Sequence, residues 1–411
     1  MAYNSAKSRY ADLGIDTERA IETLSNKAIS IQCWQGDDVI GFDGGGADGG
    51  IQATGNYPGR ARNFRELTAD FKKACELIPG KKRVNLHASY AVFDDGEHVD
   101  RDKIEYRHFA PWVTFAQTLG MGIDFNPTCF GSPMVKDGLT LSSPDEATRR
   151  FWIQHCVASR KIAEQIGQAL RDKVLCNIWI PDGLKDIPAD RLGPRMRLKD
   201  SLDQILEQKY THVIDCVESK VFGIGLESYT VGSNEFYLGY CKNRQGVYNL
   251  IDNGHFHPTE NVADKIASLL CFYDYIPLHI TRSVRWDSDH VVLFDDTVKE
   301  IFTEIARNNA LDKALIGLDF FDASINRVAA WVIGTRSAQK ALLYALLIPH
   351  ERLTAMQNSG DFTQKLTLAE NVKLMPFGAV WEEYCARQNV PADNEWFDAV
   401  TIYEQQVLLA R

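Results

Sequence analysis

Four short apolar runs in the sequence are each followed, at or within one residue of their end, by an ionisable side chain. These side chains are Glu218, Asp252, His279 and Asp319. Divalent cations such as Mn²⁺ favour carboxylate oxygens combined with imidazole nitrogen. The repeated position of these side chains therefore predicts a divalent cation site.

Three neighbouring motifs extend this set. His255 follows Asp252 after a short Asn-Gly turn, and Asp287-Ser288-Asp289 places two carboxylates two residues apart. On an extended segment such a pair points to one side. The same spacing separates the Glu and Lys of Glu218-Ser219-Lys220, so the Lys ammonium can reach a substrate oxygen bound at the cation. So many carboxylates in one place would repel one another, and their charge suits two divalent ions better than one.

Each of these residues also has a simpler interpretation when it is taken alone. A single Asp at a strand end more often caps a helix than binds a metal. A lone buried His, such as His87 after the apolar run 83–86, is more often a core residue with satisfied hydrogen bonds. The recurrence of ligand-type residues on consecutive strands favours the metal site.

The elements that must position these residues form a regular alternation of apolar strands and helical stretches. The eight predicted strands are Ser30–Gln35, Arg83–Leu86, Gly122–Phe125, Val174–Ile180, Val213–Val217, Val247–Ile251, Ile276–Leu278 and Ala314–Leu318. Near-continuous apolar strands alternating with helices indicate a parallel sheet covered on its faces. Eight such units predict an α/β fold, a closed (β/α)₈ or TIM barrel, whose active face lies at the carboxyl ends of the strands. The alternative, an open doubly wound sheet, normally carries a Gly-rich first turn, and no GxGxxG follows a strand.

Apolar residues at helical spacing predict the helices between the strands. They are Arg60–Ile78, His108–Leu119, Pro144–Leu170, Arg191–Gln208, Thr259–Tyr273, Asp295–Asn308 and Asn326–Leu347, and Ser143 is the expected cap of the third. Ser5–Ser25 is predicted as an N-terminal helix, and 349–411 as several helices ending with Trp396–Leu409. The predicted organisation is a barrel domain over 1–347 and a helical extension over 348–411.

Composition limits the partners and the compartment. Lys and Arg total 45 against 55 Asp and Glu, a net charge of −10, whereas nucleic-acid binding needs a basic face. The first residues lack the apolar core of a signal peptide, and no apolar run is long enough for a membrane span. The nine scattered Cys include no CxxC pair and are expected to be reduced, which points to the cytoplasm. The Gly-rich stretch Gly41–Gly50 has no following Lys-Ser/Thr and is interpreted as a loop rather than a phosphate cradle.

Several longer motifs resemble the L-rhamnose isomerase family. They are QCWQGDD (Gln32–Asp38), GNYPG (Gly55–Gly59), NLHA (Asn85–Ala88), NIWIPDG (Asn177–Gly183), VESK (Val217–Lys220), ESYTVGSNEFY (Glu227–Tyr237), GHFHPTE (Gly254–Glu260), RWDSDHVV (Arg285–Val292) and GLDFFDASINR (Gly317–Arg327). The resemblance covers essentially the whole chain.

This resemblance implies roles for individual residues. A structural, substrate-binding metal would take Glu218, Asp252, His279 and Asp319, and a catalytic metal would take His255, Asp287 and Asp289. Lys220 would bond the first oxygen of the sugar, and His87 would act at its ring oxygen. Trp34, Trp179 and Phe130 would form apolar walls. The implied metal is Mn²⁺, with Zn²⁺ or Co²⁺ as alternatives, and the implied assembly is a homotetramer.

The implied reaction interconverts the aldose L-rhamnose and the ketose L-rhamnulose by moving hydrogen between C1 and C2. Either a direct hydride shift or an enediol, with a carboxylate base such as Asp319, would fit these residues. Two other functions are alternatives to this reaction. A metal-dependent hydrolase on the same fold, such as an endonuclease, would need a basic groove. A sugar-binding protein would not need two metal sites and a lysine poised between them.

Overall fold

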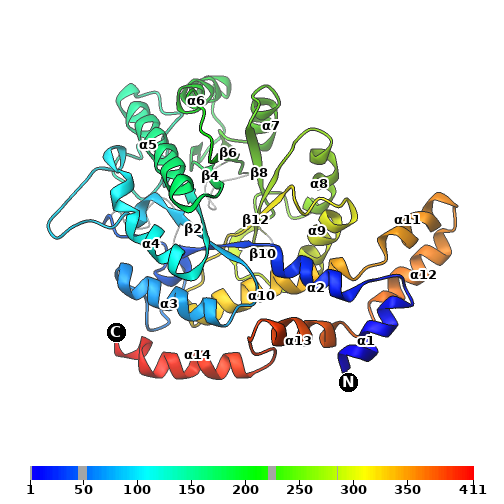
Figure 1. Cartoon of the computed structure of the whole chain (residues 1–411). Coiled ribbons are helices and arrows are strands. Elements are labelled where there is room, and N and C mark those ends of the chain that lie inside the picture. The colour runs from blue at the N-terminus through cyan, green and yellow to red at the C-terminus, as the bar shows by residue number, and fades with distance from the viewer. Residues whose placement is uncertain (1, 45–52, 221–227, 285) are drawn as a thin grey trace.

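The computed structural model describes residues 2–44, 53–220, 228–284 and 286–411, with the side chains of Trp286 and Asp287 left out. Eight parallel strands close into a barrel in the order β1-β12-β9-β8-β6-β4-β3-β2 (Figure 1). These strands are β1 (Ile29–Gln32), β2 (Lys82–His87), β3 (Gly122–Asn126), β4 (Val174–Ile178), β6 (Val213–Glu218), β8 (Val247–Asp252), β9 (Ile276–Ile280) and β12 (Ala314–Leu318). The predicted (β/α)₈ barrel is confirmed.

Helices surround the strands on the outside of the barrel (Figure 1). They are α3 (Phe64–Glu76), α4 (Ala110–Leu119), α5 (Glu146–Leu170), α6 (Leu192–Ile205), α7 (Asn234–Lys242), α8 (Val262–Leu270), α9 (Asp296–Arg307) and α10 (Arg327–Leu346). The main core lies between these helices and the outward strand residues. There Trp331 of α10 packs edge-on against Phe71 of α3, with ring centroids 5.2 Å apart, and donates its indole N–H to the carbonyl of Gln32.

The N-terminal segment differs from its prediction. It forms two helices, α1 (Ala2–Ala11) and α2 (Thr17–Asn26), instead of one. Gly14 lies between them with φ +81°, a conformation in which a helix cannot continue. Asp16 then caps α2 by accepting hydrogen bonds from the N–H groups of Glu18 and Arg19.

Other predicted boundaries differ by one to four residues, and two of these differences have a clear local cause. The first strand ends at Gln32 instead of Gln35, because Cys33–Gly36 turns into a 3₁₀ helix. The cap of α5 is Asp145, which accepts the N–H of Thr148, instead of Ser143. In both places a polar or turn-forming local contact decides the boundary, and apolar spacing does not report it.

Three small elements were not predicted. The helix α7 is short, and the two-stranded sheets β5–β7 (Gly183–Leu184 with Tyr229–Thr230) and β10–β11 (Arg282–Val284 with Trp286–His290) lie outside the barrel sheet. The strands of these sheets have two to five residues and α7 has nine, so each carries few positions to show a periodic pattern.

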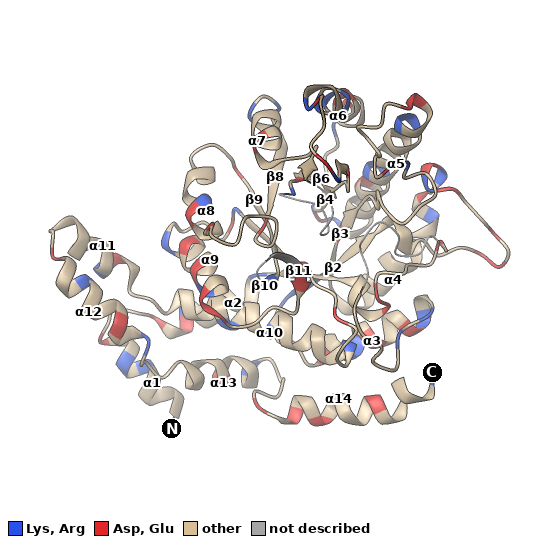
Figure 2. Cartoon of the chain, turned by 180° about the vertical axis from the view of Figure 1, so that it is seen from behind, with Lys and Arg blue, Asp and Glu red and all other residues tan. Residues whose placement is uncertain are grey.

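The chain after α10 continues as α11 (His350–Asn358), α12 (Phe362–Val372), α13 (Phe377–Arg387) and α14 (Glu395–Gln406). In Figures 1 and 2, α11 and α12 extend away from the barrel, whereas α13 and α14 run alongside it. The acidic Glu404 of α14 accepts a hydrogen bond at 3.0 Å from the Tyr57 hydroxyl and another from Asn326, which caps α10. The helical content of 348–411 is confirmed, and its status as a separate unit stays a prediction.

The inside of the barrel is divided into an apolar and a polar half. Leu175, Ile214, Cys216 and Leu250, from β4, β6 and β8, form one buried apolar cluster. On β1 to β3 the outward residues Ile31, Val84, Leu86 and Ile123 belong to the helix-facing core, so the alternating positions point inward. These inward positions are polar, namely Ser30, Gln32, Asn85, Asp124 and Asn126. Barrel interiors are usually filled by branched apolar residues, so a polar half indicates a function for this space.

A buried ion pair joins α5 to the outer face of β6. Arg160, which is 1% exposed, places Nε and Nη2 at 2.7 and 2.8 Å from the two carboxylate oxygens of Asp215. We expect Asp215→Asn to lower the free energy of unfolding by about 3–5 kcal/mol, because it leaves a buried guanidinium without its counter-charge. Denaturant titration measures this change. The control is Glu146→Gln, which breaks the exposed Arg150–Glu146 pair and should cost less than about 1 kcal/mol. Equal losses for both variants would contradict the expectation.

Candidate metal centre

Four ligand-type side chains meet at the carboxyl ends of neighbouring barrel strands. Glu218 and Asp252 are the last residues of β6 and β8, His279 lies one residue before the end of β9, and Asp319 directly follows β12. One ligand atom from each lies within 4.8 Å of the other three, and all four residues are buried. The register of the barrel therefore brings together the four residues that were predicted to hold the first metal.

The histidines of this region contact the carboxylates directly. His279 Nδ1 lies 3.4 Å from Glu218 Oε1 and 3.3 Å from Asp319 Oδ2. Burial by itself would lower the pKa of His279, but Glu218 and Asp319 beside it raise that pKa well above its usual range. Burial would likewise raise the pKa of Glu218, but His279 and His255 hold it below its usual range. The cluster thus attracts positive charge strongly.

Asp252 and Asp319 each have a carboxylate oxygen that is free of hydrogen bonds within the described residues and could bind a cation. Asp252 Oδ2 and Asp319 Oδ1 are buried and have no hydrogen-bond partner among the described residues. Burial raises the pKa of Asp252 to about 7 and also raises the pKa of Asp319. A buried acceptor without a donor costs about 1–3 kcal/mol, and a buried charge costs more. Three carboxylate groups and one imidazole with such oxygens form a suitable donor set for a divalent ion.

Neighbouring polar groups hold these ligands in place. Asn177 of β4 donates a hydrogen bond to Glu218 Oε2, and the backbone N–H of Gly254 donates to Asp252 Oδ1 at 2.6 Å. Asn177 was not predicted as a site residue. Its position in the NIWIPDG motif, two residues after the inward-facing Leu175, is the signal that could have found it.

The predicted second metal set is only partly described. His255 Nδ1 lies 3.2 Å from Glu218 Oε1, so His255 adjoins the four-residue cluster. Asp289 lies on β11, and its carbonyl accepts the N–H of Phe321, which ties this hairpin to the loop after β12. Asp289 has φ +40°, so strand alternation does not set the direction of its side chain. The side chain of Asp287 lies outside the described part of the structure.

The predicted substrate residues form one continuous surface above the cluster. The rings of Trp34 and His87 stack with centroids 4.1 Å apart, and Phe130 is 6.4 Å from Trp34 and 5.7 Å from Trp179. Lys220 Nζ lies 5.0 Å from the centre of the Trp179 ring. All of these residues except the partly buried Trp179 are buried. The structure therefore brings the aromatic walls, His87 and Lys220 to the same end of the barrel.

Two features of this surface were not predicted. Phe321, in the loop after β12, meets the Trp34 ring edge-on at 5.8 Å, and the Phe-Phe pair after Asp319 was its only sequence signal. The indole N–H groups of Trp34 and Trp179 are buried and have no acceptor among the described residues. The walls are therefore also hydrogen-bond donors, which suits a hydroxyl-rich ligand.

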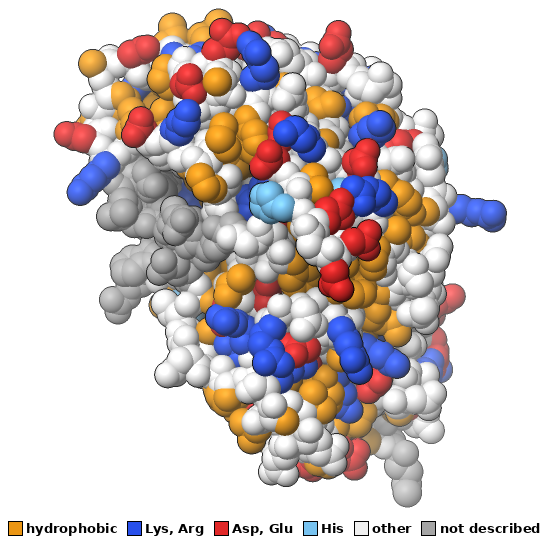
Figure 3. Space-filling model, turned by 90° about the vertical axis from the view of Figure 1, so that its left-hand side faces the viewer, with side chains coloured by type: hydrophobic (Ala, Val, Ile, Leu, Met, Phe, Trp, Pro, Cys, Tyr) orange, Lys and Arg blue, Asp and Glu red, His pale blue; other side chains and the backbone are white. Residues whose placement is uncertain are grey.

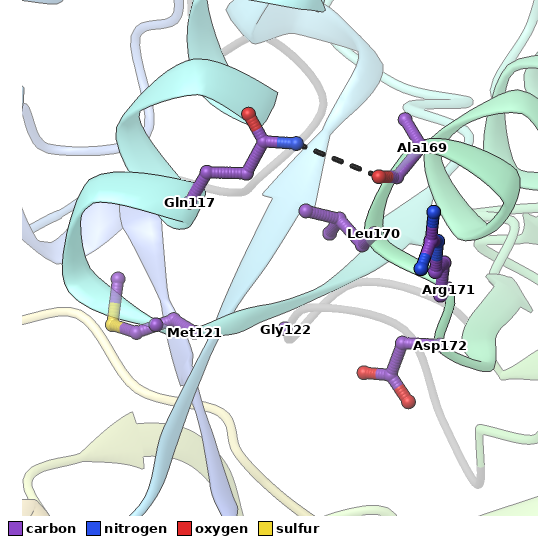
Figure 4. Close-up of a pocket in the computed structure, with 8 residues that line it drawn as sticks. Gln117, Met121, Gly122, Ala169, Leu170, Arg171 and Asp172 are labelled. Carbon is purple, nitrogen blue, oxygen red and sulfur yellow. Dashed lines mark hydrogen bonds between the residues drawn. The ribbon is translucent and has the colours of Figure 1, made fainter.

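A pocket lies at the end of the barrel opposite the metal cluster. Figure 4 shows it between the last turns of α4 and α5, lined by Gln117, Met121, Gly122, Leu170 and Arg171 among others, with a volume of about 410 Å³. Gln117 bridges it by a hydrogen bond to the carbonyl of Ala169. This end carries the amino termini of the strands, and the pocket holds no cluster of metal-ligand residues in the described part of the chain.

The outer surface, the helices and the cysteines each add one observation. On the face seen in Figure 3, Lys and Arg side chains lie among Asp and Glu side chains. Within the described residues, no helix is both long enough and apolar enough to cross a lipid bilayer. All nine cysteines are free thiols, and seven of them are buried.

A closed parallel barrel with buried carboxylates and imidazole at the strand ends defines a (β/α)₈-barrel enzyme with a candidate metal centre. Comparison with known proteins supports the same class of fold. A solved structure of L-ribulose 3-epimerase matches 77% of this chain and 95% of its own with a TM-score of 0.50, at 14% sequence identity.

Sequence comparison defines the family. The family model for L-rhamnose isomerase (RhaA) matches residues 1–411. L-rhamnose isomerase of Salmonella typhimurium is 54% identical over 414 residues, which cover 100% of this chain and 98% of that protein. The Salmonella typhi protein of the same name is 53% identical over the same lengths. The chain belongs to the L-rhamnose isomerase family.

Divalent metal is expected to stabilise the folded protein. A ligand that binds only the folded state at 100 times its Kd adds about 2.7 kcal/mol, so saturating Mn²⁺ should raise the melting temperature of chelator-treated protein. Asp252→Asn removes one ligand charge and should abolish most of this increase. Thermal denaturation with and without MnCl₂ measures it, and Asp296→Asn, an exposed carboxylate with the same charge change, is the control. An unchanged response in Asp252→Asn would exclude that residue as a ligand.

Proposed function

We propose that this enzyme interconverts L-rhamnose and L-rhamnulose. The observation that carries the proposal is the buried group of Glu218, Asp252, His279 and Asp319 at the mouth of the barrel. Membership of the L-rhamnose isomerase family supports the choice of substrate.

We further propose two divalent cation sites, with Mn²⁺ as the metal and Zn²⁺ or Co²⁺ as alternatives. The first would use Glu218, Asp252, His279 and Asp319, and the second would use His255, Asp287 and Asp289. Bound divalent cations would polarise the oxygens of the sugar and lower the pKa of bound water. The buried, unsatisfied oxygens of Asp252 and Asp319 support the first site.

Lys220 is the proposed donor to the first oxygen of the sugar. It follows Glu218 by two residues, its backbone N–H is fixed by the carbonyl of Gly232 at 3.1 Å, and its side chain is 5% exposed. An ammonium group stabilises negative charge on O1 most when that charge is largest, during hydrogen transfer.

His87 and the aromatic walls would hold the ring of the sugar. Burial lowers the pKa of His87 to about 3, so its imidazole is neutral near pH 7 and has one donor and one acceptor nitrogen. Stacking on Trp34 fixes the plane of this imidazole, and both of its nitrogens lack partners among the described residues. His87 is therefore suited to a hydrogen bond with the ring oxygen, and Trp34, Phe130 and Trp179 to contacts with the apolar parts of the sugar.

Two routes for hydrogen between C1 and C2 remain open in this proposal. One is a direct hydride shift. The other passes through an enediol, with Asp319 or Asp289 as the group that accepts and returns the proton. Both routes need the reacting atoms to be held in a fixed geometry, which the buried ligands and aromatic walls favour.

The proposed assembly is a homotetramer in the cytoplasm. Large apolar side chains are exposed in the C-terminal segment, namely Phe362, Leu366, Leu374, Phe397, Ile402 and Leu409. Exposed apolar side chains on both α12 and α14 support contacts between subunits. The nine free thiols support a reducing compartment.

The direct test is an assay with L-rhamnose. Purified protein with Mn²⁺ should produce ketose, and protein treated with a chelator until elemental analysis finds no metal should be inactive. Ketose formation also separates this function from the two alternatives, because neither a hydrolase nor a sugar-binding protein would produce it. Full turnover by metal-free protein would exclude the metal-dependent reaction.

Lys220→Met is expected to lower kcat on the order of 100-fold or more at saturating Mn²⁺, with a much smaller change in KM. The reason is that a donor to developing negative charge stabilises the transition state more than the bound sugar. Steady-state kinetics with L-rhamnose measure both constants. Lys199→Met, on the exposed side of α6, is the control. If Lys220 only neutralised the carboxylates, the variant would bind Mn²⁺ more weakly but keep a kcat within a few-fold of wild type.

A further inference from the structure

A row of three inward positions, one of them the cluster residue His279, crosses the barrel at the base of the metal cluster. Ser30 of β1 pairs with Gly317 of β12, and Gly317 pairs with His279 of β9. Since paired residues on adjacent strands project to the same side of the sheet, Ser30 and His279 face the barrel interior on either side of a residue without a side chain.

Gly317 leaves space beside the His279 ring. A Cβ at this position would lie 2.9 Å from His279 Cδ2 and 3.4 Å from its Nε2. This space belongs to a cavity of about 290 Å³ that Ser30, Asn85, His279 and Gly317 line. Lys27, which precedes β1, is among its other lining residues, so the cavity extends from the metal cluster toward the amino-terminal end of the barrel.

Polar atoms in this space lack partners. Ser30 Oγ and Asn85 Nδ2 are buried without a hydrogen-bond partner among the described residues, and these residues are 3% and 1% exposed. Native proteins satisfy nearly all such atoms with protein groups or ordered water. A buried water makes about three hydrogen bonds and needs a polar, sufficiently large site, which this cavity provides.

His279 presents its second ring nitrogen to the same cavity. Its Nδ1 faces Glu218 and Asp319, at 3.4 and 3.3 Å. Its Nε2 lies on the side of Gly317, and His279 lines the cavity there. A histidine that binds a metal through one ring nitrogen almost always donates the other N–H to a carboxylate, a carbonyl or water.

Two basic side chains that line the cavity, Arg83 and Lys27, are already engaged. Arg83 binds Asp124 at 3.0 Å and also contacts Asp172. Lys27 donates to the carbonyls of Leu311 and Ala314. Because neither of these cations is free to bind an anion, the cavity suits neutral hydrogen-bonding molecules of the size of water.

We propose that ordered water in this cavity accepts the Nε2–H of His279 and is held by Ser30 and Asn85. Water would accept from His279 and from the Asn85 amide, and it would donate to the Ser30 hydroxyl. Ser30 and Gly317 are therefore positioning residues, which orient a metal ligand from beneath without contacting metal or sugar. This inference depends on the metal site of the proposed function.

The test measures Mn²⁺ affinity in the full chain after removal of metal. Isothermal titration with MnCl₂ should show a roughly 10-fold weaker Kd for Ser30→Ala than for wild type, because loss of an outer hydrogen-bond partner typically weakens metal binding 10–100-fold. Ser30→Thr keeps the hydroxyl and should restore the affinity. The matched control is Ser159→Ala on α5, a buried hydroxyl away from the barrel interior, which should bind Mn²⁺ as wild type does.

Gly317→Ala tests the same cavity from the other side. Its methyl group occupies the space beside His279 and should weaken Mn²⁺ binding by more than 10-fold. If this variant does not fold, the Mn²⁺ affinities of Ser30→Ala and Ser30→Thr by themselves test the role of the cavity. Wild-type affinity in Ser30→Ala, or equal losses in Ser30→Ala and Ser30→Thr, would overturn the role of the hydroxyl. A wild-type protein that binds no Mn²⁺ would instead overturn the proposed metal site itself, and this inference with it.

Discussion

The burial of Glu218, Asp252 and Asp319 around His279 is the constraint on which the site depends. Three carboxyl groups lie within 4.8 Å of one another and of an imidazole in a region closed to solvent. Repulsion and loss of hydration would make this arrangement unfavourable without positive charge among the oxygens. The raised pKa values of Asp252 and His279 are the response of the protein alone to that constraint. A bound divalent cation would offset the repulsion between these carboxylates more completely than protonation does. The four residues whose burial is electrostatically unfavourable therefore form a good metal site.

Barrel closure makes this burial possible. Strands β6, β8, β9 and β12 are neighbours in the barrel, so residues at their carboxyl ends converge without any long loop. Below them the interior is divided between an apolar cluster on one side and polar residues on the other. The apolar side gives the barrel a packed wall, whereas the polar side leaves space and hydrogen-bonding groups beneath His279. Asn177, which pairs with Cys216 two residues before Glu218, thus holds this ligand by a hydrogen bond, and a cavity lies beneath His279.

The remaining elements hold the upper edge of the site. Trp34 lies in the 3₁₀ turn after β1, and this turn is held in place because the side chain of Trp331 in α10 donates to the carbonyl of Gln32. The C-terminal helix α14 adds a further support, since Glu404 joins Tyr57, in the loop after β1, to the start of α10. Residues far from the metal cluster therefore fix the position of the wall that would contact the sugar.

Local sequence alone determined the eight strands and most helices, because apolar spacing reports which face of an element is buried. It also pointed to Glu218, Asp252, His279 and Asp319, since a parallel barrel places all strand ends on one face. It missed the helix break at Gly14 and misplaced the end of β1, where single turns decide the boundary. It did not reveal that Asn177 bonds Glu218, that Phe321 meets Trp34, or that Ser30 and His279 face each other across Gly317. Those contacts join residues far apart in the chain, and they depend on strand register and barrel closure, which only the tertiary structure decides.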